Sequence, residues 1–289
     1  SVSTASLDVL KSTDSASTAT AFATGVKVHN KEISTLNLKE LPTITEYLKE
    51  QKIGVGLVTT DSLYSQTVAA YSSHVPNEEN IEEIISDQLN SNVDLFLGSG
   101  RDLYSEYRLD FNEKGYYYFN NYKEIDLNCN KILGVFDELG DEKTVNTIPS
   151  LDVLTNIAVN FMETNFPDGY FLVIECGHID KMSHNVNIFE MMEYLENFDK
   201  AVKDTYELLK DDESAAIIVT ANHETGSLSY NGESKDNINS VDLIKYDGHT
   251  LVDVPYYIYF SDESVNNYFL PEIIDNTDIY KICKALLSD

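Results

Sequence analysis

The sequence is poor in arginine and has few cysteines and no tryptophan. Only two of its 20 basic residues are arginines, Arg101 and Arg108, and 49 acidic residues bring the formal net charge to −29. Such a charge repels nucleic acid phosphates and anionic membrane surfaces, which argues against nucleic acid binding. Because bidentate arginine clamps are so scarce, we expect any anionic ligand to need metal ions for its neutralisation.

Other absences narrow the class of protein further. The three cysteines, Cys129, Cys176 and Cys283, have no CxxC spacing and form no disulfide framework. Cysteine usage therefore does not distinguish an oxidising from a reducing compartment. No apolar run approaches the roughly 18 residues of a membrane span. The N-terminus has neither the basic start nor the apolar stretch of a signal peptide, which fits a mature chain or a part of one.

Helical and strand patterns alternate along the 289 residues. Apolar strand patterns occur at 53–60, 93–100, 169–175, 215–221 and 254–260, and helical patterns at 16–25, 41–51, 79–90, 151–162, 188–210 and 278–287. Strands that are apolar on both faces predict a mostly parallel sheet covered by helices on both sides, a three-layer α/β/α sandwich. We expect one domain over 1–289, with a Tyr- and Asn-rich insertion at about 101–146.

Metal-binding side chains follow several of these strands. In parallel sheets, ligands collect at the carboxyl ends of the strands. A lone histidine there is more often a loop residue than a ligand, but three of the six histidines lie at such ends beside Asp or Asn, which favours a zinc or magnesium cluster. The candidates are Thr67, Glu175, Asp180, His184, Asn222, His223 and His249. His74 is predicted to be structural, and His29 and His178 are given no role.

Six blocks of the sequence, taken together, resemble the motifs of alkaline phosphatases in order and approximate spacing. The blocks are TDSASTATAFATG, TTDSLYSQTVAAYSSHV, DLFLGSG, ECGHIDKMSHNVN, IIVTANHETG and DGHTLVDVPYYIY. The resemblance covers almost the whole chain from about Ser12. It implies an alkaline-phosphatase-like α/β/α fold, zinc and magnesium cofactors, and hydrolysis of small-molecule phosphate monoesters through a phosphoserine.

The resemblance also implies a role for individual residues. Ser15 matches the nucleophile; it stands where a helix begins, so a phosphate bound there would face the helix N-terminus, although a simple N-cap is the alternative. Lys181 matches a lysine near the phosphate in some members, and a solvated surface lysine is its alternative. The implied metal ligands are Asp180, His184 and His249 for the first zinc, Asn222 and His223 for the second zinc, and Thr67 and Glu175 for magnesium.

Three departures from the family pattern fall on one side of this site. The chain has no strand with a GDGMG-like segment, whose Asp bridges the second zinc and the magnesium in the family; if that strand belongs in the middle of the sheet, its absence leaves unpaired edges. Asn222 stands where the family has Asp, and Glu78 where it usually has a phosphate-clamping Arg. We therefore expect reduced activity, in either a part of a longer protein or a degenerate homologue.

Two other functions remain open at this point. The departures favour a phosphatase-like protein that binds metal or phosphate without turnover. Related sulfatases, phosphodiesterases and phosphomutases suggest other substrates, although Ser15 and the lack of a CxPxR-like segment argue against a sulfatase. The resemblance further implies an extracellular or periplasmic location and a homodimer.

Overall fold

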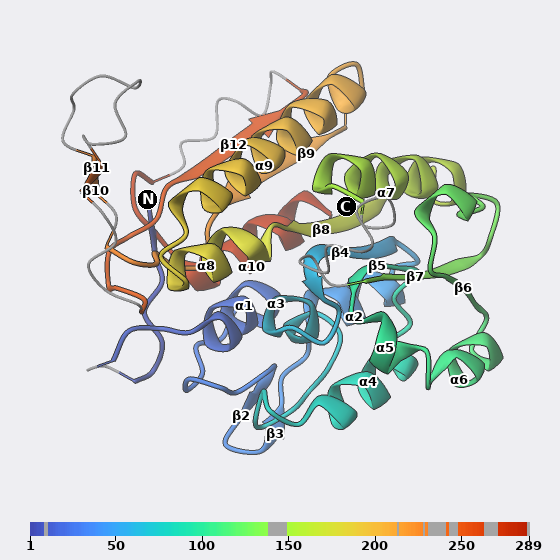
Figure 1. The fold of residues 1–289 in the computed structure, drawn as a ribbon, viewed down its shortest axis with the longest axis horizontal. Coiled ribbons are helices and arrows are strands. Elements are labelled where there is room, and N and C mark those ends of the chain that lie inside the picture. The colour runs from blue at the N-terminus through green and yellow to red at the C-terminus, as the bar shows by residue number, and fades with distance from the viewer. Residues whose placement is uncertain are drawn as a thin grey trace.

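The centre of the molecule is a five-stranded parallel sheet with strand order β6-β7-β5-β4-β8 (Figure 1). The computed structural model describes residues 1–8, 11–137, 149–212, 214–227, 248–262 and 271–287, and the backbone of 229–230 and 241–242. The strands are β4 (Gly54–Ser62), β5 (Leu95–Ser99), β6 (Tyr116–Phe119), β7 (Lys131–Phe136) and β8 (Tyr170–Glu175). The prediction of a mostly parallel central sheet is confirmed.

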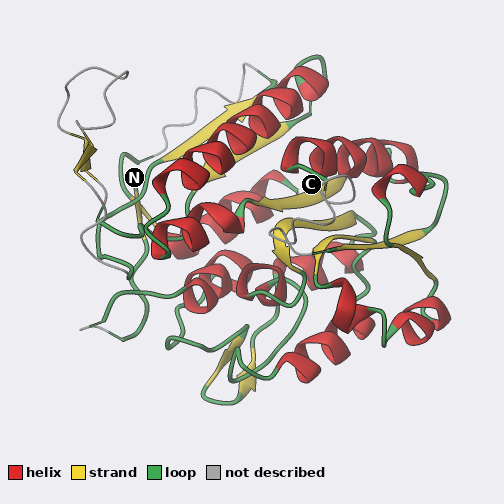
Figure 2. Cartoon of the chain, viewed as in Figure 1, coloured by secondary structure: helices red, strands yellow, loops and turns green. Residues whose placement is uncertain are grey.

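Helices cover both faces of this sheet (Figure 2). They are α1 (Ser15–Thr24), α2 (Ile44–Glu50), α3 (Gln66–Ala70), α4 (Ile81–Asn90), α5 (Arg101–Tyr104), α6 (Arg108–Glu113), α7 (Leu151–Asn165), α8 (Gly177–His184), α9 (Ile188–Leu209) and α10 (Asn276–Leu286), with a 3-10 turn at Tyr122–Glu124. Each helical range predicted from periodicity overlaps one of these helices.

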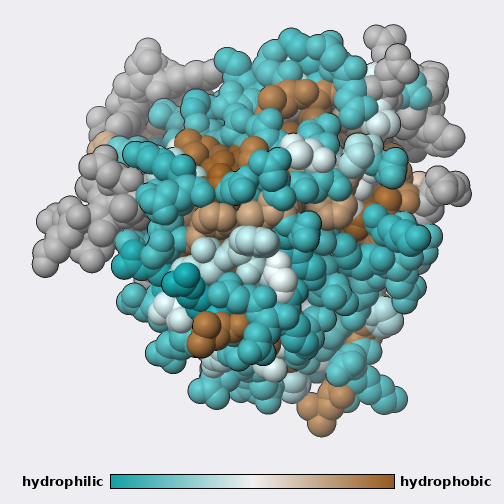
Figure 3. All heavy atoms as spheres, turned by 90° about the vertical axis from the view of Figure 1, so that its right-hand side faces the viewer, coloured by the Kyte–Doolittle hydropathy of each residue, from teal (hydrophilic) through white to brown (hydrophobic). Residues whose placement is uncertain are grey.

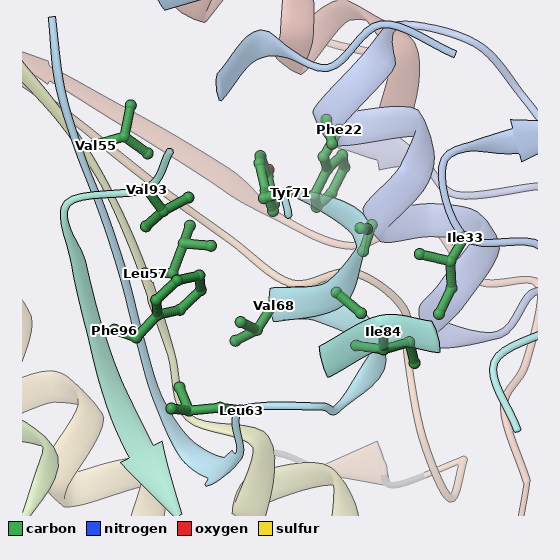
Figure 4. Close-up of a cluster of buried hydrophobic side chains, with 14 of the residues drawn as sticks. Phe22, Ile33, Val55, Leu57, Leu63, Val68, Tyr71, Ile84, Val93 and Phe96 are labelled. Carbon is green, nitrogen blue, oxygen red and sulfur yellow. The ribbon is translucent and has the colours of Figure 1, made fainter. Parts of the chain in front are cut away.

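The two-sided core follows from the alternation of side chains along each strand. In β4, Val55 and Leu57 enter one buried cluster, which includes side chains of α1, α3 and α4 (Figure 4). Val58 enters a second cluster with α7 and α9. Gly56 faces α7, where an added Cβ would lie 2.5 Å from the Met162 side chain. Glycine at this position therefore lets α7 pack close to the sheet.

A separate strand pair lies beside this sheet. β9 (Ala216–Thr220) and β12 (Tyr256–Phe260) pair antiparallel, and within the described residues no pairing joins β9 to β8. Phe171 of β8 and Ile218 of β9 nevertheless pack against the same cluster. The predicted strands at 215–221 and 254–260 are thus present, but they form an antiparallel pair and do not extend the described parallel sheet.

Short strand pairings and isolated bridges also occur outside these sheets. β1 (Val2–Ser3) pairs parallel with β13 (Ile274–Asp275), β2 (Thr35–Leu36) pairs with β3 (Lys39–Glu40), and β10 (Ser229–Tyr230) pairs with β11 (Val241–Asp242). An antiparallel bridge joins Val2 to Val254. The two ends of the described chain therefore meet through β1 and β13.

The segment predicted as an insertion, 101–146, supplies α5, α6, β6 and β7. β6 and β7 form one edge of the sheet, in parallel register with β5. Residues 138–146 of the segment lie outside the described residues, and its boundaries, like the single domain over 1–289, remain predictions.

The surface reflects the composition. The face shown in Figure 3 is mostly hydrophilic, with hydrophobic side chains in separate patches. Among the described helices, none has both the length and the apolar character needed to cross a membrane.

Candidate metal centre and nucleophile

Three predicted zinc ligands converge beyond the carboxyl end of β8. Asp180 and His184 lie one turn apart on α8, and His249 precedes β12. His184 Nε2 lies 3.1 Å from His249 Nε2, and Asp180 Oδ1 lies 3.4 Å and 3.6 Å from these two nitrogens. One ligand atom from each residue therefore falls within 4.8 Å of the other two.

This spacing fits a zinc ion. Four ligands placed tetrahedrally around zinc at about 2.0–2.1 Å are separated from each other by roughly 3.3 Å, close to the three distances found here. Two imidazoles and one carboxylate are also a typical ligand set for this ion. All three side chains are partly exposed, so an ion can reach them from solvent.

Neighbouring groups orient the ligands. His249 Nδ1 donates to the carbonyl oxygen of Thr13 at 2.8 Å, so Nε2 is the ring nitrogen left to face Asp180, His184 and a metal. Thr225 Oγ1 donates to Asp180 Oδ1 at 2.5 Å and lies 3.2 Å from His223 Nδ1. These contacts fix the directions of the ligand atoms.

Ser15 reaches the same cluster from α1. Asp14 is the N-cap of α1, and its Oδ1 accepts from the Ser17 backbone N–H at 2.8 Å. Ser15 Oγ lies 2.9 Å from His223 Nε2, and the His223 ring stacks on His249 with centroids 3.6 Å apart. A hydroxyl group thus stands at a helix N-terminus, a favourable place for an anion, within one imidazole of the zinc-ligand cluster.

The electrostatics of the cluster favour a bound cation. Burial opposes ionisation of Asp180, but the His249 hydrogen bond and the charges of His223 and His184 lower its pKa to about 2. Burial, followed by the charge of His249, lowers the pKa of His223 to about 3. A carboxylate and an uncharged imidazole at neutral pH are the forms that bind metals.

The predicted magnesium ligands lie beside this cluster. Glu175 ends β8, and its Oε2 accepts from Thr59 Oγ1 at 2.7 Å; Thr67 also hydrogen-bonds to its carboxylate. Burial, together with the charges of Asp61 and Asp180, raises the pKa of Glu175 to about 7. Such an enclosed carboxyl group, bonded by hydroxyls, is an oxygen-donor set suited to a hard cation.

Lys181 lines a cavity together with the predicted zinc ligand His184. Its Nζ lies 2.5 Å from Asp61 Oδ1. The cavity, of about 360 Å³, is lined by Asp61, Ser99, His178, Lys181, Met182, His184 and Asn185. Lys181 therefore has a specific partner and is no freely solvated surface lysine.

Two of the three departures from the family pattern, Asn222 and Glu78, are side chains that the structure describes. Asn222 Oδ1 accepts from the backbone N–H of His223 at 3.1 Å, and its role as a ligand of the second zinc remains a prediction. Glu78 is half-buried, and burial together with the charge of Asp14 raises its pKa. An acidic group thus lies near the residue that caps the Ser15 helix.

The other histidines make structural contacts. His74 lies 3.1 Å from Glu46 Oε1 and 3.1 Å from the Ser34 carbonyl oxygen. His29 pairs with Asp8, and the buried His178 lies 3.0 Å from Thr60 Oγ1.

Sequence reasoning missed Asp61, Thr59 and Thr225. Each of the three contacts a side chain that is distant in sequence; Asp61 and Lys181, for example, are separated by 120 positions. The available signal was their position: Thr59 and Asp61 belong to the polar carboxyl end of β4, and Thr225 follows His223 in the HETG block.

The fold and site together define an α/β protein with a serine and a candidate metal centre at the carboxyl edge of its sheet. The chain belongs to the alkaline phosphatase family, whose sequence pattern it matches over residues 2–269.

Individual relatives agree with this assignment. The chain is 31% identical over 232 residues to alkaline phosphatase 3 of Bacillus subtilis, covering 75% of this chain and 50% of the relative. It is 26% identical over 276 residues to the Escherichia coli alkaline phosphatase, covering 74% and 58%. The chain thus spans about half the length of the curated relatives it matches.

Solved structures show the same fold. A cold-active alkaline phosphatase from Shewanella superposes with a TM-score of 0.86 at 24% identity, covering 100% of this chain and 89% of the other. The alkaline phosphatase of the Antarctic bacterium TAB5 superposes with a TM-score of 0.84 at 24% identity, covering 99% and 86%. The expected alkaline-phosphatase-like architecture is confirmed.

Proposed function

We propose that this protein is a metal-dependent phosphate monoester hydrolase that acts through a phosphoserine at Ser15. One observation supports this most directly: Ser15 Oγ, at the N-terminus of α1, contacts His223, whose ring stacks on His249 of the Asp180–His184–His249 cluster. A nucleophile, an anion-binding helix end and a cation site are thereby adjacent.

The ligand assignment follows the family resemblance. Asp180, His184 and His249 would hold the first zinc, His223 and Asn222 the second zinc, and Thr67 and Glu175 the magnesium. When bound, these cations supply positive charge that offsets the phosphate and lowers the pKa of nearby hydroxyl groups.

The residues of the chain position the reacting groups. The N–H groups of the first turn of α1 orient the phosphate, and Lys181 donates to its oxygens when free of Asp61. Ser15 Oγ forms a bond to phosphorus while the bond to the alcohol oxygen breaks, and the released alcohol takes up a proton. Water then attacks phosphorus, and Ser15 Oγ leaves and regains its proton. Positioning and charge neutralisation account for most of the catalysis in phosphoryl transfer.

A second candidate is a phosphatase-like protein that binds metal or phosphate without turnover. The half-buried Glu78 near Asp14 favours it, because an acidic group at this place repels phosphate. In this case zinc binds at Asp180, His184 and His249, but no phosphate is released. Restoring Glu78→Arg and Asn222→Asp would then produce no turnover either.

Location and assembly are proposed on the family resemblance. We expect the protein to act in an extracellular or periplasmic compartment and to form a homodimer, with small-molecule phosphate monoesters as substrates. Size-exclusion chromatography with light scattering tests the dimer.

The decisive experiment measures phosphate release from an aryl phosphate between pH 7 and 10, on protein dialysed with zinc and magnesium. Ser15→Ala should abolish the release, and Ser105→Ala, an exposed serine on a distant helix end, should leave it unchanged. Aryl phosphodiester and sulfate ester assayed in parallel should react far more slowly. Activity that survives Ser15→Ala contradicts the proposed mechanism.

A further inference from the structure

We propose that Asp61 competes with the substrate phosphate for Lys181 and so limits how tightly the site holds phosphate. This inference rests on the proposed function, because it assigns a positioning residue to the same site. Asp61 is not among the residues that the family resemblance assigns.

The geometry makes Asp61 the fixed partner of the pair. Its side chain is 13% exposed, whereas that of Lys181 is 48% exposed. Asp61 Oδ1 also accepts from the Ser62 backbone N–H at 2.6 Å, and the Asp61 N–H donates to Thr59 Oγ1 at 3.0 Å. An added Cβ on Gly177, at the start of α8, would lie only 3.0 Å from Asp61 Cβ, so α8 closes against it. When the pair separates, Lys181 moves.

Lys181 lies on the helix that carries two of the predicted zinc ligands. Lys181 directly follows Asp180 on α8, and His184 lies on the next turn of the helix. Both Lys181 and His184 line the cavity of about 360 Å³. Among the lining residues Lys181 is the single lysine or arginine. Lys181 is therefore the lining residue that can give a phosphate in this cavity a cationic side-chain contact.

An ammonium group bonded to a carboxylate cannot offer the same hydrogen bonds to a phosphate. Both are anionic acceptors that form charge-assisted hydrogen bonds with Lys181 Nζ. Phosphate binding must therefore break the Asp61 contact, and the energy of that contact is subtracted from phosphate affinity. A weaker hold on phosphate favours release of the product.

A simple through-space effect of the Asp61 charge predicts a different result. If Asp61 only repelled phosphate, removing Lys181 would weaken phosphate binding by the same factor whether or not Asp61 was present. If Asp61 oriented Lys181 toward phosphate, that factor would be smaller without Asp61. Competition alone predicts a larger factor without Asp61.

The test is a double-mutant cycle on the zinc- and magnesium-loaded protein. The dissociation constant of inorganic phosphate is measured by calorimetry for the wild type, Asp61→Asn, Lys181→Met and the double variant. We expect Lys181→Met to weaken phosphate binding by a factor about two to five times larger in the Asp61→Asn protein, the range contributed by a partly exposed ion pair. An equal or smaller factor overturns the proposal. Glu207→Gln, which removes the remote Glu207–Lys210 pair, should leave the constant unchanged.

A second readout does not depend on phosphate. Acylation of Lys181 by acetic anhydride, measured by mass spectrometry relative to Lys281, should be faster in Asp61→Asn than in the wild type. An unchanged rate shows that Asp61 does not hold Lys181 and overturns the inference alone. If Lys181 becomes more reactive but no variant binds phosphate and no Ser15-dependent hydrolysis occurs, the proposed function is what fails, and the competition fails with it.

Discussion

The Nε2 atoms of His184 and His249 lie 3.1 Å apart, although 65 positions separate the two residues. Because His249 Nδ1 donates a hydrogen bond to the Thr13 carbonyl oxygen, Nε2 is the ring nitrogen that faces His184. Asp180 Oδ1 lies within 3.6 Å of both nitrogens. The arrangement is open to a cation, and folding alone brings the three donor atoms to ligand spacing.

Zinc should therefore stabilise the folded protein through this cluster. At free zinc about 1,000-fold above its dissociation constant, one site adds about 4 kcal/mol to the free energy of unfolding. His249→Ala should remove most of this gain, measured as the difference in melting temperature with zinc and with a chelator. His29→Ala, which alters an exposed histidine paired with Asp8, serves as the control and should retain the full zinc shift. Equal zinc shifts in His249→Ala and the wild type would refute the site.

Thr225 should tune the affinity of the same site. Its hydroxyl donates to Asp180 Oδ1, and such contacts around a metal ligand are typically worth 10- to 100-fold in affinity. We expect Thr225→Val to weaken zinc binding about tenfold, measured by competition with a chromogenic chelator. The matched control is Thr164→Val, because Thr164 donates only to a carbonyl of its own exposed helix turn. If both variants bind zinc like the wild type, Thr225 does not orient Asp180.

The sequence predicted the elements that carry a strong hydrophobic period. The strand at 169–175 and the helix at 188–210 were located because their apolar residues recur at the spacing of a buried strand and an amphipathic helix. β6 and β7 were missed as strands because YYYF and KILGVF are short and lie in a segment dominated by Tyr, Asn and charge. The antiparallel pairing of β9 with β12 was equally hidden, because pairing depends on contacts far apart in the chain.

The candidate site was also predictable from the sequence only in part. The side chains that follow strands, such as Asp180 and His223, could be named from the sequence, because strand ends of a parallel sheet meet at one edge. The contacts of Asp61 with Lys181 and of Thr225 with Asp180 could not, since they depend on how α8 and the HETG loop lie in space. The assigned roles of all these residues remain predictions.

Glu78 should reduce both stability and phosphate affinity. Its pKa is raised, mainly by burial and then by the charge of Asp14, so ionisation of Glu78 costs free energy in the folded protein. An acid whose folded pKa is raised destabilises the protein at pH values above its unfolded pKa of about 4.3. We expect Glu78→Gln to increase the free energy of unfolding at pH 7 by at most about 1 kcal/mol, since the group is only half-buried.

The Glu78→Gln protein should also bind inorganic phosphate several-fold more tightly than the wild type, because the neutral amide does not repel the anion. Urea unfolding at pH 7 and at pH 4, together with calorimetric titration of phosphate, measures both effects. Glu79→Gln, at the exposed neighbour of Glu78, is the control for a general change in charge. A Glu78→Gln protein that is less stable at pH 7 than the wild type would show that the carboxylate is needed where it lies.

The His74–Glu46 contact should make stability depend on pH. The His74 hydrogen bond, opposed by burial, lowers the pKa of Glu46 to about 2, and this contribution is present above the unfolded pKa of about 4.3. The pKa of His74 is raised: burial opposes this, but the hydrogen bonds to Glu46 and Ser34 outweigh it. The histidine contribution is therefore complete below about pH 6.5 and is lost as the pH rises through the folded pKa.

The Glu46 and His74 contributions are both fully present between about pH 4.3 and 6.5. Glu46→Gln should therefore be most destabilising in this pH range. Glutamine keeps an oxygen that can accept from the Thr43 N–H in the capping box of α2, so the variant isolates the charge. Because the Glu46 side chain is 49% exposed, we expect a loss of at most about 1 kcal/mol at pH 6 and a smaller loss at pH 9. Urea unfolding at both pH values measures the difference, with Glu50→Gln at the exposed end of the same helix as the control. A loss that is equal at pH 6 and pH 9 would mean that His74 is uncharged in the folded protein and that the contact is an ordinary hydrogen bond.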